Sequence, residues 1–445
     1  MSTPKLLERL YSLEHLAFAW KNIDKTNPES FGLSGESIAE FGENIETNLQ
    51  NLSHQIKSGT FQFFKTRPYL IAKDNGKFRP LQIPEVRDRI VLKGIAIILE
   101  EQLQKNLVSS EGISFAYQKG KGIQNALSRV KEHYDNGNHI IYEADIIDFF
   151  GTVSRDKIIK QVCDQLSDPS LNDFIKSGIT PKVGSLESIP FDQQYLFIDK
   201  GGIPQGNALS PLFSNIYLSP FDAEMKRIGY HLVRYADDFV ILAPSKEVAI
   251  QAYEDSRTYL KDQLALDIHE LSEAQTSKTR IVDPKKDLFS FLSVSFDGIN
   301  LFPSIKNKDR FIDKILSLCN STKDRNIIKV LNKVKNSHDG WISTFLFTDV
   351  ERYFEEIDWI INWGIYIYLK SCEWKFKRTS LAKMPQRFRQ RCNIRYESGE
   401  CLSQQQRKNS GIPLSKEIYL LRMQKVQKDK ISHKVPENQP KALAI

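Results

Sequence analysis

The feature that most constrains the fold is the stretch LVRYADDFVIL at residues 232–242. Apolar and β-branched residues, which favour strands, flank the small polar centre Ala236-Asp237-Asp238. Two such runs around a short polar centre are typical of a β-hairpin. An Asp-Asp pair in a turn is ordinarily a solvated loop tip. The apolar strands on both sides instead favour a buried hairpin with two carboxylates at its tip.

A third aspartate follows a second predicted strand. Residues 139–143 have a short strand pattern and lead into Asp145. If the strands pack side by side, the carboxylates of Asp145, Asp237 and Asp238 converge, and they repel one another unless a cation joins them. Hard oxygen ligands of this kind suit Mg²⁺. Two such ions about 3.5–4 Å apart can activate an attacking 3′-hydroxyl and stabilise a leaving pyrophosphate, which is polymerase chemistry.

A loop rich in glycine and proline, GIPQGNALSP at residues 202–211, precedes an apolar stretch at 212–218 that we expect to be helical. Such a loop can lay its backbone close against a nucleotide or a template base. A tight turn stopped by proline is the alternative. The loop by itself does not choose between the two.

A second hairpin is predicted at residues 69–84, where two β-type runs are joined by Asp-Asn-Gly. Cations that could clamp a triphosphate gather on this arm and just beyond it: Lys73, Arg79, Arg87 and Arg89. Exposed basic residues are also commonly a solvated face.

Helical periodicity surrounds these strands. Helices are expected at 41–56, closed by Gly59, and at 90–103 and 122–133. The stretch from Phe150 to about Lys200 is charged and poorly periodic, and we expect helices and loops there. Past Pro303 the pattern is helical, which indicates a domain separate from the sheet.

Basic residues interleave with Trp374, Phe376 and Phe388 near the C-terminus. The basic candidates in this stretch are Lys375, Lys377, Arg378, Arg387 and Arg389. This mixture favours contact with a nucleic-acid backbone and stacking on bases over plain solubility. The net charge of +7 is compatible with a polyanionic partner.

Several classes of protein are excluded. The five cysteines are scattered without a CxxC pair, which argues against a disulfide framework and a structural zinc site and fits a reducing cytoplasm. No Ser-His-Asp or Cys-His set supports hydrolase chemistry. The start of the chain does not resemble a signal peptide, and the most apolar stretch, 357–369, is shorter than a membrane span. We expect a soluble, cytoplasmic protein.

Together these segments resemble a known family, the reverse transcriptases of bacteria, which are related to those of group II introns and retrons. Residues 235–238 (YADD) resemble the family's YxDD box, and 145–150 (DIIDFF) resemble its first catalytic box. Residues 202–206 with 209–211 resemble its template and nucleotide loop. Further resemblances are to the fingers motif (79–84 with Arg87 and Arg89), the segment before the palm (114–121), the lysine-bearing box (278–280) and the primer-grip hairpin (289–296). Several motifs in the family's order are far more specific than one.

The resemblance implies a metal site. Asp145, the backbone carbonyl of Ile146 and Asp237 would hold two Mg²⁺ ions, with Mn²⁺ as an alternative, and Asp238 would support them. It also implies that Phe150 excludes a ribose 2′-hydroxyl and so selects dNTPs. An aromatic residue after a strand is often a core residue, so packing is the alternative role of Phe150.

The resemblance implies substrate contacts as well. Lys73 and Arg79 would hold the triphosphate, and Lys278 would act as a general acid for pyrophosphate. The nucleotide and template would lie against the side chains or backbone of Gln205, Gly206 and Tyr235.

The implied fold is the α+β right-hand polymerase fold, in which fingers and a palm with an antiparallel sheet flanked by helices are followed by an α-helical thumb and C-terminal region. The expected regions are an N-terminal helical region (1–60), fingers with part of the palm (61–144), the palm with the YADD hairpin and an insert near 153–200 (145–300), a helical thumb (301–370) and a basic C-terminal extension (371–445).

The subgroup follows by elimination. No paired Cys-and-His cluster of an intron endonuclease occurs, and the retron boxes NAxxH and VTG are missing, since residues 125–129 read NALSR. The chain therefore most resembles the stand-alone, defence-associated reverse transcriptases of bacteria, which pair with a small non-coding RNA and act against phage. The implied partners are that RNA as template, its cDNA product and dNTPs, with no membrane and an open oligomeric state. An RNA-binding maturase and a transferase that makes untemplated DNA are the alternatives.

Overall fold

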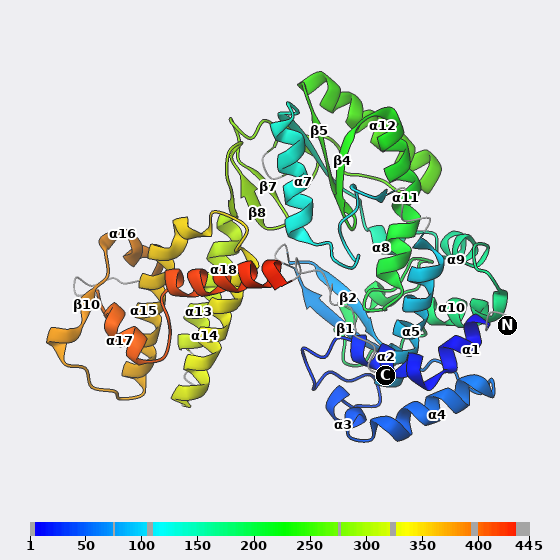
Figure 1. Ribbon diagram of the computed structural model, residues 1–445, viewed down its shortest axis with the longest axis horizontal. Helices are drawn as coiled ribbons and strands as arrows, with labels where there is room; N and C mark the ends of the chain where they lie inside the picture. Colours follow the sequence, from blue (N-terminus) through cyan, green and yellow to red (C-terminus); the bar gives the residue numbers. More distant parts are fainter. Residues whose placement is uncertain are drawn as a thin grey trace, which may run out of the picture. The chain divides into compact units, whose positions relative to one another are not determined.

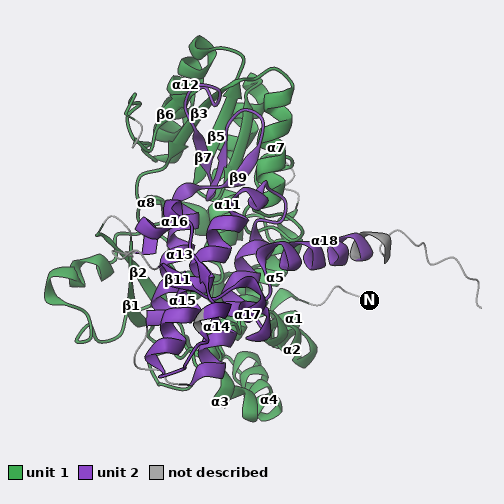
Figure 2. Ribbon diagram, turned by 90° about the vertical axis from the view of Figure 1, so that its left-hand side faces the viewer, with its two compact units in different colours: residues 1–282 green, residues 283–445 purple. Residues whose placement is uncertain are grey.

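The computed structural model describes residues 5–73, 76–104, 110–274, 277–320, 326–392 and 399–432 (Figure 1). The chain divides into two compact units, residues 1–282 and 283–445 (Figure 2). The division falls inside the region predicted as palm, 145–300, so the predicted primer-grip hairpin belongs to the second unit.

The first unit opens with short helices that pack with one another and with a long buried helix, α5. These elements are α1 (Leu6–Tyr11), α2 (Leu13–Asn22), α3 (Ile38–Glu43), α4 (Ile45–Lys57) and α5 (Val86–Gln102). The single helix expected at 41–56 is two helices, because Asn44 leaves the helical conformation and Gly42 beside it has low helix propensity. As predicted, α4 ends just before Gly59, whose φ is +73°.

The arm predicted at residues 69–84 is confirmed as an antiparallel hairpin of β1 (Arg67–Ala72) and β2 (Phe78–Ile83). The predicted turn residues at 74 and 75 lie outside the described residues. Arg79 pairs with Ile71 across the hairpin. The arm therefore carries its basic side chains on an ordered two-stranded scaffold.

The palm sheet contains the predicted catalytic hairpin. Its antiparallel strand order is β4-β5-β3-β6. The bounds are β3 (Ile140–Asp145), β4 (His231–Tyr235), β5 (Asp238–Ala243) and β6 (Arg280–Val282). Both the hairpin and the strand leading into Asp145 are as predicted.

Helices cover this sheet and form the core with it. The elements are α7 (Ile123–Asp135) and α11 (Ser210–Ile228), which pack against β4, and α12 (Lys246–Leu264), which packs against β3 and β5. Phe239 of β5 is fully buried, with ring centroids 5.9 Å from Tyr142 and 5.2 Å from Phe221. This burial holds the sheet rigidly at the end that carries the aspartates.

The stretch predicted as helices and loops, 153–200, is built that way. It follows α8 (Phe149–Thr152) and contains α9 (Arg155–Cys163), η2 (Pro169–Leu171), α10 (Asn172–Ile179) and η3 (Phe191–Phe197). Ile158 and Ile175 are fully buried in the core of the first unit. The stretch is thus an integral part of this unit.

The second unit begins with a small antiparallel sheet, β7 (Phe289–Phe291), β8 (Val294–Phe296) and β9 (Leu301–Pro303). The expected helices follow: α13 (Ile305–Asn320), α14 (Ile327–Thr344), η4 (Val350–Tyr353) and α15 (Phe354–Ser371). The C-terminal part contains η5 (Arg378–Ser380), β10 (Ala382–Lys383), α16 (Gln386–Arg389), η6 (Gln390–Cys392), β11 (Glu400–Cys401), α17 (Gln404–Asn409) and α18 (Ser415–Ser432). No helix among the described residues is long and apolar enough to span a bilayer.

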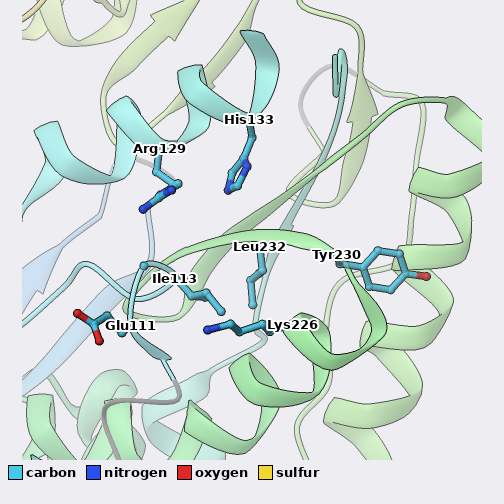
Figure 3. A pocket seen from close by; sticks show the side chains of 8 residues that line it. Glu111, Ile113, Arg129, His133, Lys226, Tyr230 and Leu232 are labelled. Atoms are coloured by element: carbon cyan, nitrogen blue, oxygen red, sulfur yellow. The ribbon is translucent and has the colours of Figure 1, made fainter. Parts of the chain in front are cut away.

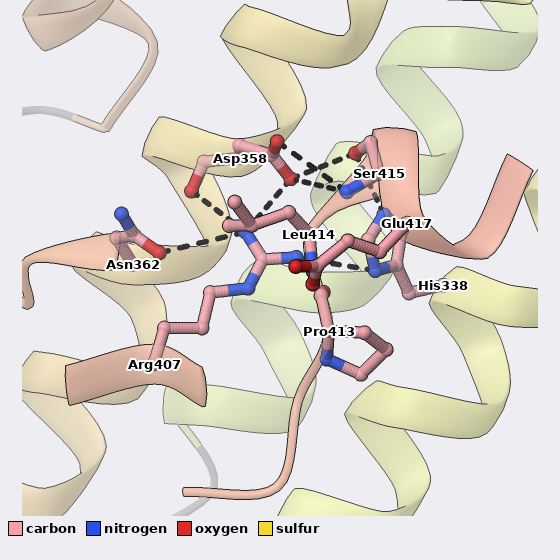
Figure 4. Close-up of polar contacts among 8 residues, drawn as sticks. All are labelled: His338, Asp358, Asn362, Arg407, Pro413, Leu414, Ser415 and Glu417. Carbon is pink, nitrogen blue, oxygen red and sulfur yellow. Dashed lines mark hydrogen bonds and ion pairs between the residues drawn. The ribbon is translucent and has the colours of Figure 1, made fainter. Parts of the chain in front are cut away.

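A buried arginine joins the C-terminal helices to the thumb-like helices (Figure 4). Arg407 of α17 is fully buried and donates to Asp358 Oδ1 of α15 at 2.8 Å and to the Pro413 carbonyl at 2.7 Å. His338 of α14 bonds Ser415 of α18 at 2.9 Å. The described part of the predicted C-terminal extension is therefore packed into the second unit.

Candidate active site

Asp145 and Asp238 face each other on neighbouring strands. Asp145 ends β3, Asp238 begins β5, and the two are paired directly in the antiparallel register. Directly opposed residues have Cβ atoms about 4.5–5.5 Å apart. Asp237 lies in the turn between Tyr235 and Asp238, which are themselves paired across β4 and β5. The structure thus brings the three predicted carboxylates to one end of the sheet.

The electrostatics of this end reflect crowded negative charge. Burial raises the pKa of Asp237, and the carboxylate of Asp145 raises it further. Burial and then the charges of Asp237 and Asp145 raise the pKa of Asp238 to about 7. The side chain of Asp238 is exposed, so the charges of Asp237 and Asp145 are the main cause of its raised pKa. Carboxylates this close together favour the binding of a cation.

A lysine supplies part of that charge. Lys278 forms an ion pair with Asp145, and His269 Nε2 lies 3.7 Å from Asp145 Oδ2. The ammonium of Lys278 lowers the pKa of Asp237, opposing the larger effect of burial. The lysine predicted to act near pyrophosphate is therefore beside the carboxylates.

The donor set fits a hard divalent cation, although it is not arranged as a finished site. As the side chains stand, no group of three His, Cys, Asp or Glu residues in the described ranges is placed to hold a metal ion. The donors are nevertheless carboxylate oxygens, and such oxygens are the ligands that Mg²⁺ prefers. Ile146, whose carbonyl is the further predicted ligand, is buried and forms a β-bridge with Ile268.

Two adjacent phenylalanines follow the first carboxylate. Phe149 is buried in the core, whereas Phe150 is half-buried, and their rings meet edge to face at 5.5 Å. Asp148, which precedes them, has a φ of +44°. Phe149 is therefore a core residue, whereas Phe150 packs against the core with part of its ring exposed, and its role as a steric gate stays a prediction.

The glycine- and proline-rich loop docks on α8 at its first glycine. The N–H of Ile203 donates to the Phe150 carbonyl at 2.8 Å. A Cβ at Gly202 would lie 2.2 Å from that same oxygen. Only glycine fits this close approach, so the loop is fixed to the segment that carries Phe150.

The same loop contacts the arm at its second glycine. The N–H of Gln82 donates to the Gln205 carbonyl at 2.8 Å. Gly206 has a φ of +96°, and a Cβ there would lie 2.9 Å from the Gln82 carbonyl oxygen. Packing against α8 and β2 thus accounts for both glycines, and contact of Gln205 or Gly206 with a nucleotide stays a prediction.

The predicted phosphate-binding cations differ in their surroundings. Arg79 is exposed on β2, and its charge lowers the pKa of Asp237 against the dominant effect of burial. Lys73 is exposed at the end of β1. Arg79 therefore acts electrostatically on Asp237, and its contact with a triphosphate stays a prediction.

Arg87 and Arg89 are engaged in packing. The Arg87 guanidinium lies 4.5 Å from the Phe61 ring centroid and 3.4 Å from Asp88. Arg89 donates to the Pro84 carbonyl at 2.9 Å and to Ser30 at 3.1 Å. Burial lowers the pKa of both arginines. These contacts explain both residues without nucleic acid, and their predicted binding role remains a prediction.

The predicted basic residues near the C-terminus belong to the second unit. Lys375 and Lys377 are exposed, and Trp374 beside them is 57% exposed. Arg387 forms an ion pair with Glu355. Arg389 donates to the Met384 carbonyl at 2.9 Å. The side chain of Arg378 lies outside the described residues.

Sequence reasoning did not single out Tyr117. This residue has a φ of +58° and a half-exposed side chain. Burial, followed by the charges of Asp237 and Tyr235, raises its pKa. Tyr117 therefore lies beside the carboxylate cluster, and its place within residues 114–121, which resemble the segment before the palm, was the available signal.

A separate pocket lies at the other end of β4 (Figure 3). Its cavity is about 250 Å³, and its lining residues are Glu111, Gly112, Ile113, Arg129, His133, Lys226, Tyr230 and Leu232. Burial and then the nearby His231 and Arg129 lower the pKa of His133 to about 4. None of the predicted site residues lines this pocket.

Comparison with known proteins gives a family match. The model of the family "Reverse transcriptase (RNA-dependent DNA polymerase)" matches residues 71–296, just over half of the chain and a range that contains all three aspartates. Protein YkfC of Escherichia coli K12 is 25% identical over 303 residues, which are 59% of this chain and 76% of YkfC. The group II intron-encoded protein LtrA of Lactococcus lactis is 25% identical over 312 residues, 55% of this chain but only 49% of LtrA. The chain thus spans about half the length of LtrA.

Solved structures give weaker likenesses. A partial Cas6-RT-Cas1–Cas2 complex is 24% identical with a TM-score of 0.34, covering 59% of this chain and 43% of that one. Apo telomerase from Candida tropicalis is 12% identical with a TM-score of 0.45, covering 90% and 73%.

Proposed function

This chain belongs to the reverse transcriptase family of RNA-dependent DNA polymerases, and from that premise we propose that it extends a primer on an RNA template at the end of the palm sheet. The observation that carries the proposal is the direct pairing of Asp145 with Asp238, with Asp237 in the adjoining turn. A purely binding protein has no physical need to hold three carboxylates beside bound phosphate, because they repel it.

Asp145, Asp237 and the Ile146 carbonyl would hold the divalent cations, Mg²⁺ or Mn²⁺, with Asp238 in support. When bound, such ions activate the attacking 3′-hydroxyl and stabilise the leaving pyrophosphate. Lys278 partly neutralises the cluster through Asp145. As a general acid, its ammonium would give a proton to the departing pyrophosphate.

The remaining residues would bind and select the nucleotide. Arg79 and Lys73 would hold the triphosphate, since both are cations on the arm whose β2 strand bonds the 202–206 loop. Phe150 would exclude the ribose 2′-hydroxyl. Its half-buried ring and its hydrogen-bonded backbone, which the loop fixes, support this role. The template and nucleotide contacts of Gln205, Gly206 and Tyr235 complete the proposal.

Primer extension tests the proposed activity. The purified chain, an RNA template with an annealed primer, dNTPs and Mg²⁺ should give elongated DNA, and Asp237→Ala should abolish it. Asp262→Ala, at an exposed position on α12, is the matched control and should leave extension unchanged. Extension that survives Asp237→Ala would overturn the proposal.

We also propose a cellular role for this activity. The resemblance to the defence-associated reverse transcriptases of bacteria supports an enzyme of the bacterial cytoplasm that copies a partner non-coding RNA in defence against phage. Sequencing the nucleic acid that co-purifies from infected and uninfected cells tests this role. A single cellular RNA with its complementary DNA is the expected result, and random fragments would contradict it.

A maturase role is the second candidate, because matched relatives such as LtrA are named as intron-encoded proteins. A maturase would differ from a polymerase in that its function would not need the three carboxylates. If Asp145→Ala still restores the cellular phenotype, RNA binding is the function and polymerisation is secondary. A third reading, untemplated DNA synthesis, shares every catalytic residue and is separated by the sequence of the product.

A further inference from the structure

We propose that Arg234 is a positioning residue that fixes the turn carrying Asp237, an inference that rests on the proposed function. Arg234 immediately precedes the YADD box and is 0% exposed. Its ion-pair partner, Asp222 of α11, is also 0% exposed. A fully buried ion pair one residue before a catalytic box calls for a physical explanation, because desolvating two charges is costly.

Every nitrogen of the Arg234 guanidinium donates at least one hydrogen bond. Nε donates to Asp222 Oδ1 at 2.7 Å and Nη2 donates to Asp222 Oδ2 at 2.5 Å. Nη1 donates to Asn215 Oδ1 at 3.2 Å and to the Ala236 carbonyl at 2.9 Å. Asp222 and Asn215 both come from α11. The guanidinium thus ties a rigid buried helix to the backbone of the hairpin turn.

The bond to Ala236 is the one that bears on the carboxylates. Ala236 has a φ of +60°, a left-handed conformation that is strained for a residue with a Cβ. Its carbonyl belongs to the same planar peptide group as the N–H of Asp237. The hydrogen bond to this oxygen therefore fixes the orientation of the whole peptide group. The Cα of Asp237 belongs to that group, so the position of the Asp237 side chain is fixed with it.

The same arginine fixes a second element beside the site. Its backbone N–H donates to the Ile113 carbonyl at 2.9 Å, and its carbonyl accepts from Phe115 N–H at 3.0 Å. Asn215 accepts from Ser114 Oγ at 3.2 Å and donates to the Ala116 carbonyl at 2.9 Å. This segment leads directly to Tyr117 beside Asp237. One buried network therefore orients both the turn and the neighbouring tyrosine.

Lysine cannot replace this arginine, because it has a single nitrogen and no planar fork. In the variant Arg234→Lys, an ammonium that stays with Asp222 would leave the Ala236 carbonyl without its donor. We expect Arg234→Lys to remain folded and to lose rate. A misplacement of reacting groups by about 1 Å costs up to roughly 10²-fold in rate.

A double variant can separate the contribution of Arg234 to folding from its contribution to positioning the turn. Arg234→Met alone leaves the buried carboxylate of Asp222 without an ion-pair partner, and we expect this variant to unfold. The double variant Arg234→Met with Asp222→Leu replaces the pair by apolar groups of similar size, which commonly preserves stability. It still leaves the Ala236 carbonyl without its donor. We expect a melting temperature near that of the wild type with a maximal rate of nucleotide addition reduced about 10- to 100-fold, while the dNTP KM changes little.

Arg407→Lys is the matched control, since Arg407 is equally buried and pairs with Asp358 in the second unit (Figure 4). It should lower the melting temperature without changing the maximal rate measured well below that temperature. A purely structural role of Arg234 would make the Arg234 and Arg407 variants behave alike.

Hydrogen exchange gives a readout independent of activity. Amides of residues 235–238 should exchange faster in the double variant, at least about tenfold, whereas those of α12 should not change. Unchanged exchange at 235–238 in the folded double variant overturns the inference, whatever the rate. If the wild type fails to extend any primer, the proposed function fails, and the exchange result still decides the role of Arg234.

Discussion

Lys278 forms an ion pair with Asp145, so a cation from the segment just before β6 contacts the carboxylate that ends β3. The other two aspartates lie at the same end of the sheet, where the charges of Arg79 and Lys278 lower the pKa of Asp237 against the larger effect of burial. Burial and the carboxylate of Asp145 raise the pKa of Asp237, and the charges of Asp237 and Asp145 raise the pKa of the exposed Asp238.

Replacing Lys278 by methionine should move the acid limb of activity to higher pH. The lysine charge lowers the pKa of Asp237. Its loss therefore raises that pKa, so the carboxylate ionises only at higher pH. The rate of single-nucleotide addition should also fall about 10²-fold, the scale of lost general-acid catalysis. Lys246→Met, which removes a surface pair with Glu273, is the control and should leave the profile unchanged. An unshifted acid limb in Lys278→Met would contradict this view of the lysine.

Asp238→Asn should stabilise the protein in the absence of divalent ions. The folded pKa is about 7, against an ordinary 3.8, so between about pH 4 and 7 the folded state binds more protons than the unfolded one. Stability therefore falls as pH rises through that window, and asparagine removes this loss. We expect a gain of roughly 1–2 kcal/mol at pH 8, discounted for the exposure of Asp238, and none near pH 4, as measured by urea unfolding.

Asp88→Asn provides the comparison for that experiment. Burial raises the pKa of Asp88 to about 7 as well, but Asp88 lies on α5 beside Arg87. Both variants should gain stability at high pH. Added Mg²⁺ should stabilise the wild type and Asp88→Asn more than Asp238→Asn. Equal effects of Mg²⁺ on all three would show that the ion does not bind at the carboxylate cluster.

Phe150→Val should admit ribonucleotides. A smaller side chain leaves room for the 2′-hydroxyl, and steric discrimination of this size is worth about 10- to 200-fold. The measurement is the ratio of kcat/KM for dNTP and rNTP. Phe149→Leu is the matched control, because Phe149 is the core member of the pair and should change stability but not the ratio. An unchanged ratio in Phe150→Val would assign Phe150 to packing alone.

Gly206→Ala should impair activity beyond its cost in stability. Gly206 and Gly229 both have positive φ, so alanine at either position should cost about 1–2 kcal/mol. Only at Gly206 does the new Cβ meet the backbone of Gln82, whereas nothing lies within 4 Å at Gly229. Primer extension should fall in Gly206→Ala and not in Gly229→Ala. Equal activity in the two variants would show that the link between loop and arm is dispensable.

Local pattern was enough to predict the strands that carry the aspartates. Residues 232–242 are two apolar runs around a short polar centre, which is enough to predict a hairpin, and the strand before Asp145 is likewise a short apolar run. The arm at 69–84 was predictable for the same reason. The helix at 41–56 was not, because a strong apolar stripe concealed the break at Asn44.

Contacts between distant segments could not be predicted from the sequence. Arg234 pairs with Asp222 on another element, and nothing in the local sequence marks either as buried. Arg87 was expected to be an exposed cation, yet it stacks on Phe61, a contact that depends on how α5 packs. Tyr117 reaches the carboxylates only because its segment bonds to β4. Buried polar residues are where a sequence pattern is least informative, since their partners lie elsewhere in the chain.

The sequence of the DNA product made on a defined RNA template tests templated synthesis at this site most directly. We predict DNA complementary to the RNA over the extended length, made by the wild type with Mg²⁺ and dNTPs and absent with Asp145→Ala or Asp237→Ala. Product that does not match the template, or matching product that persists in either variant, would contradict RNA-directed synthesis by these carboxylates.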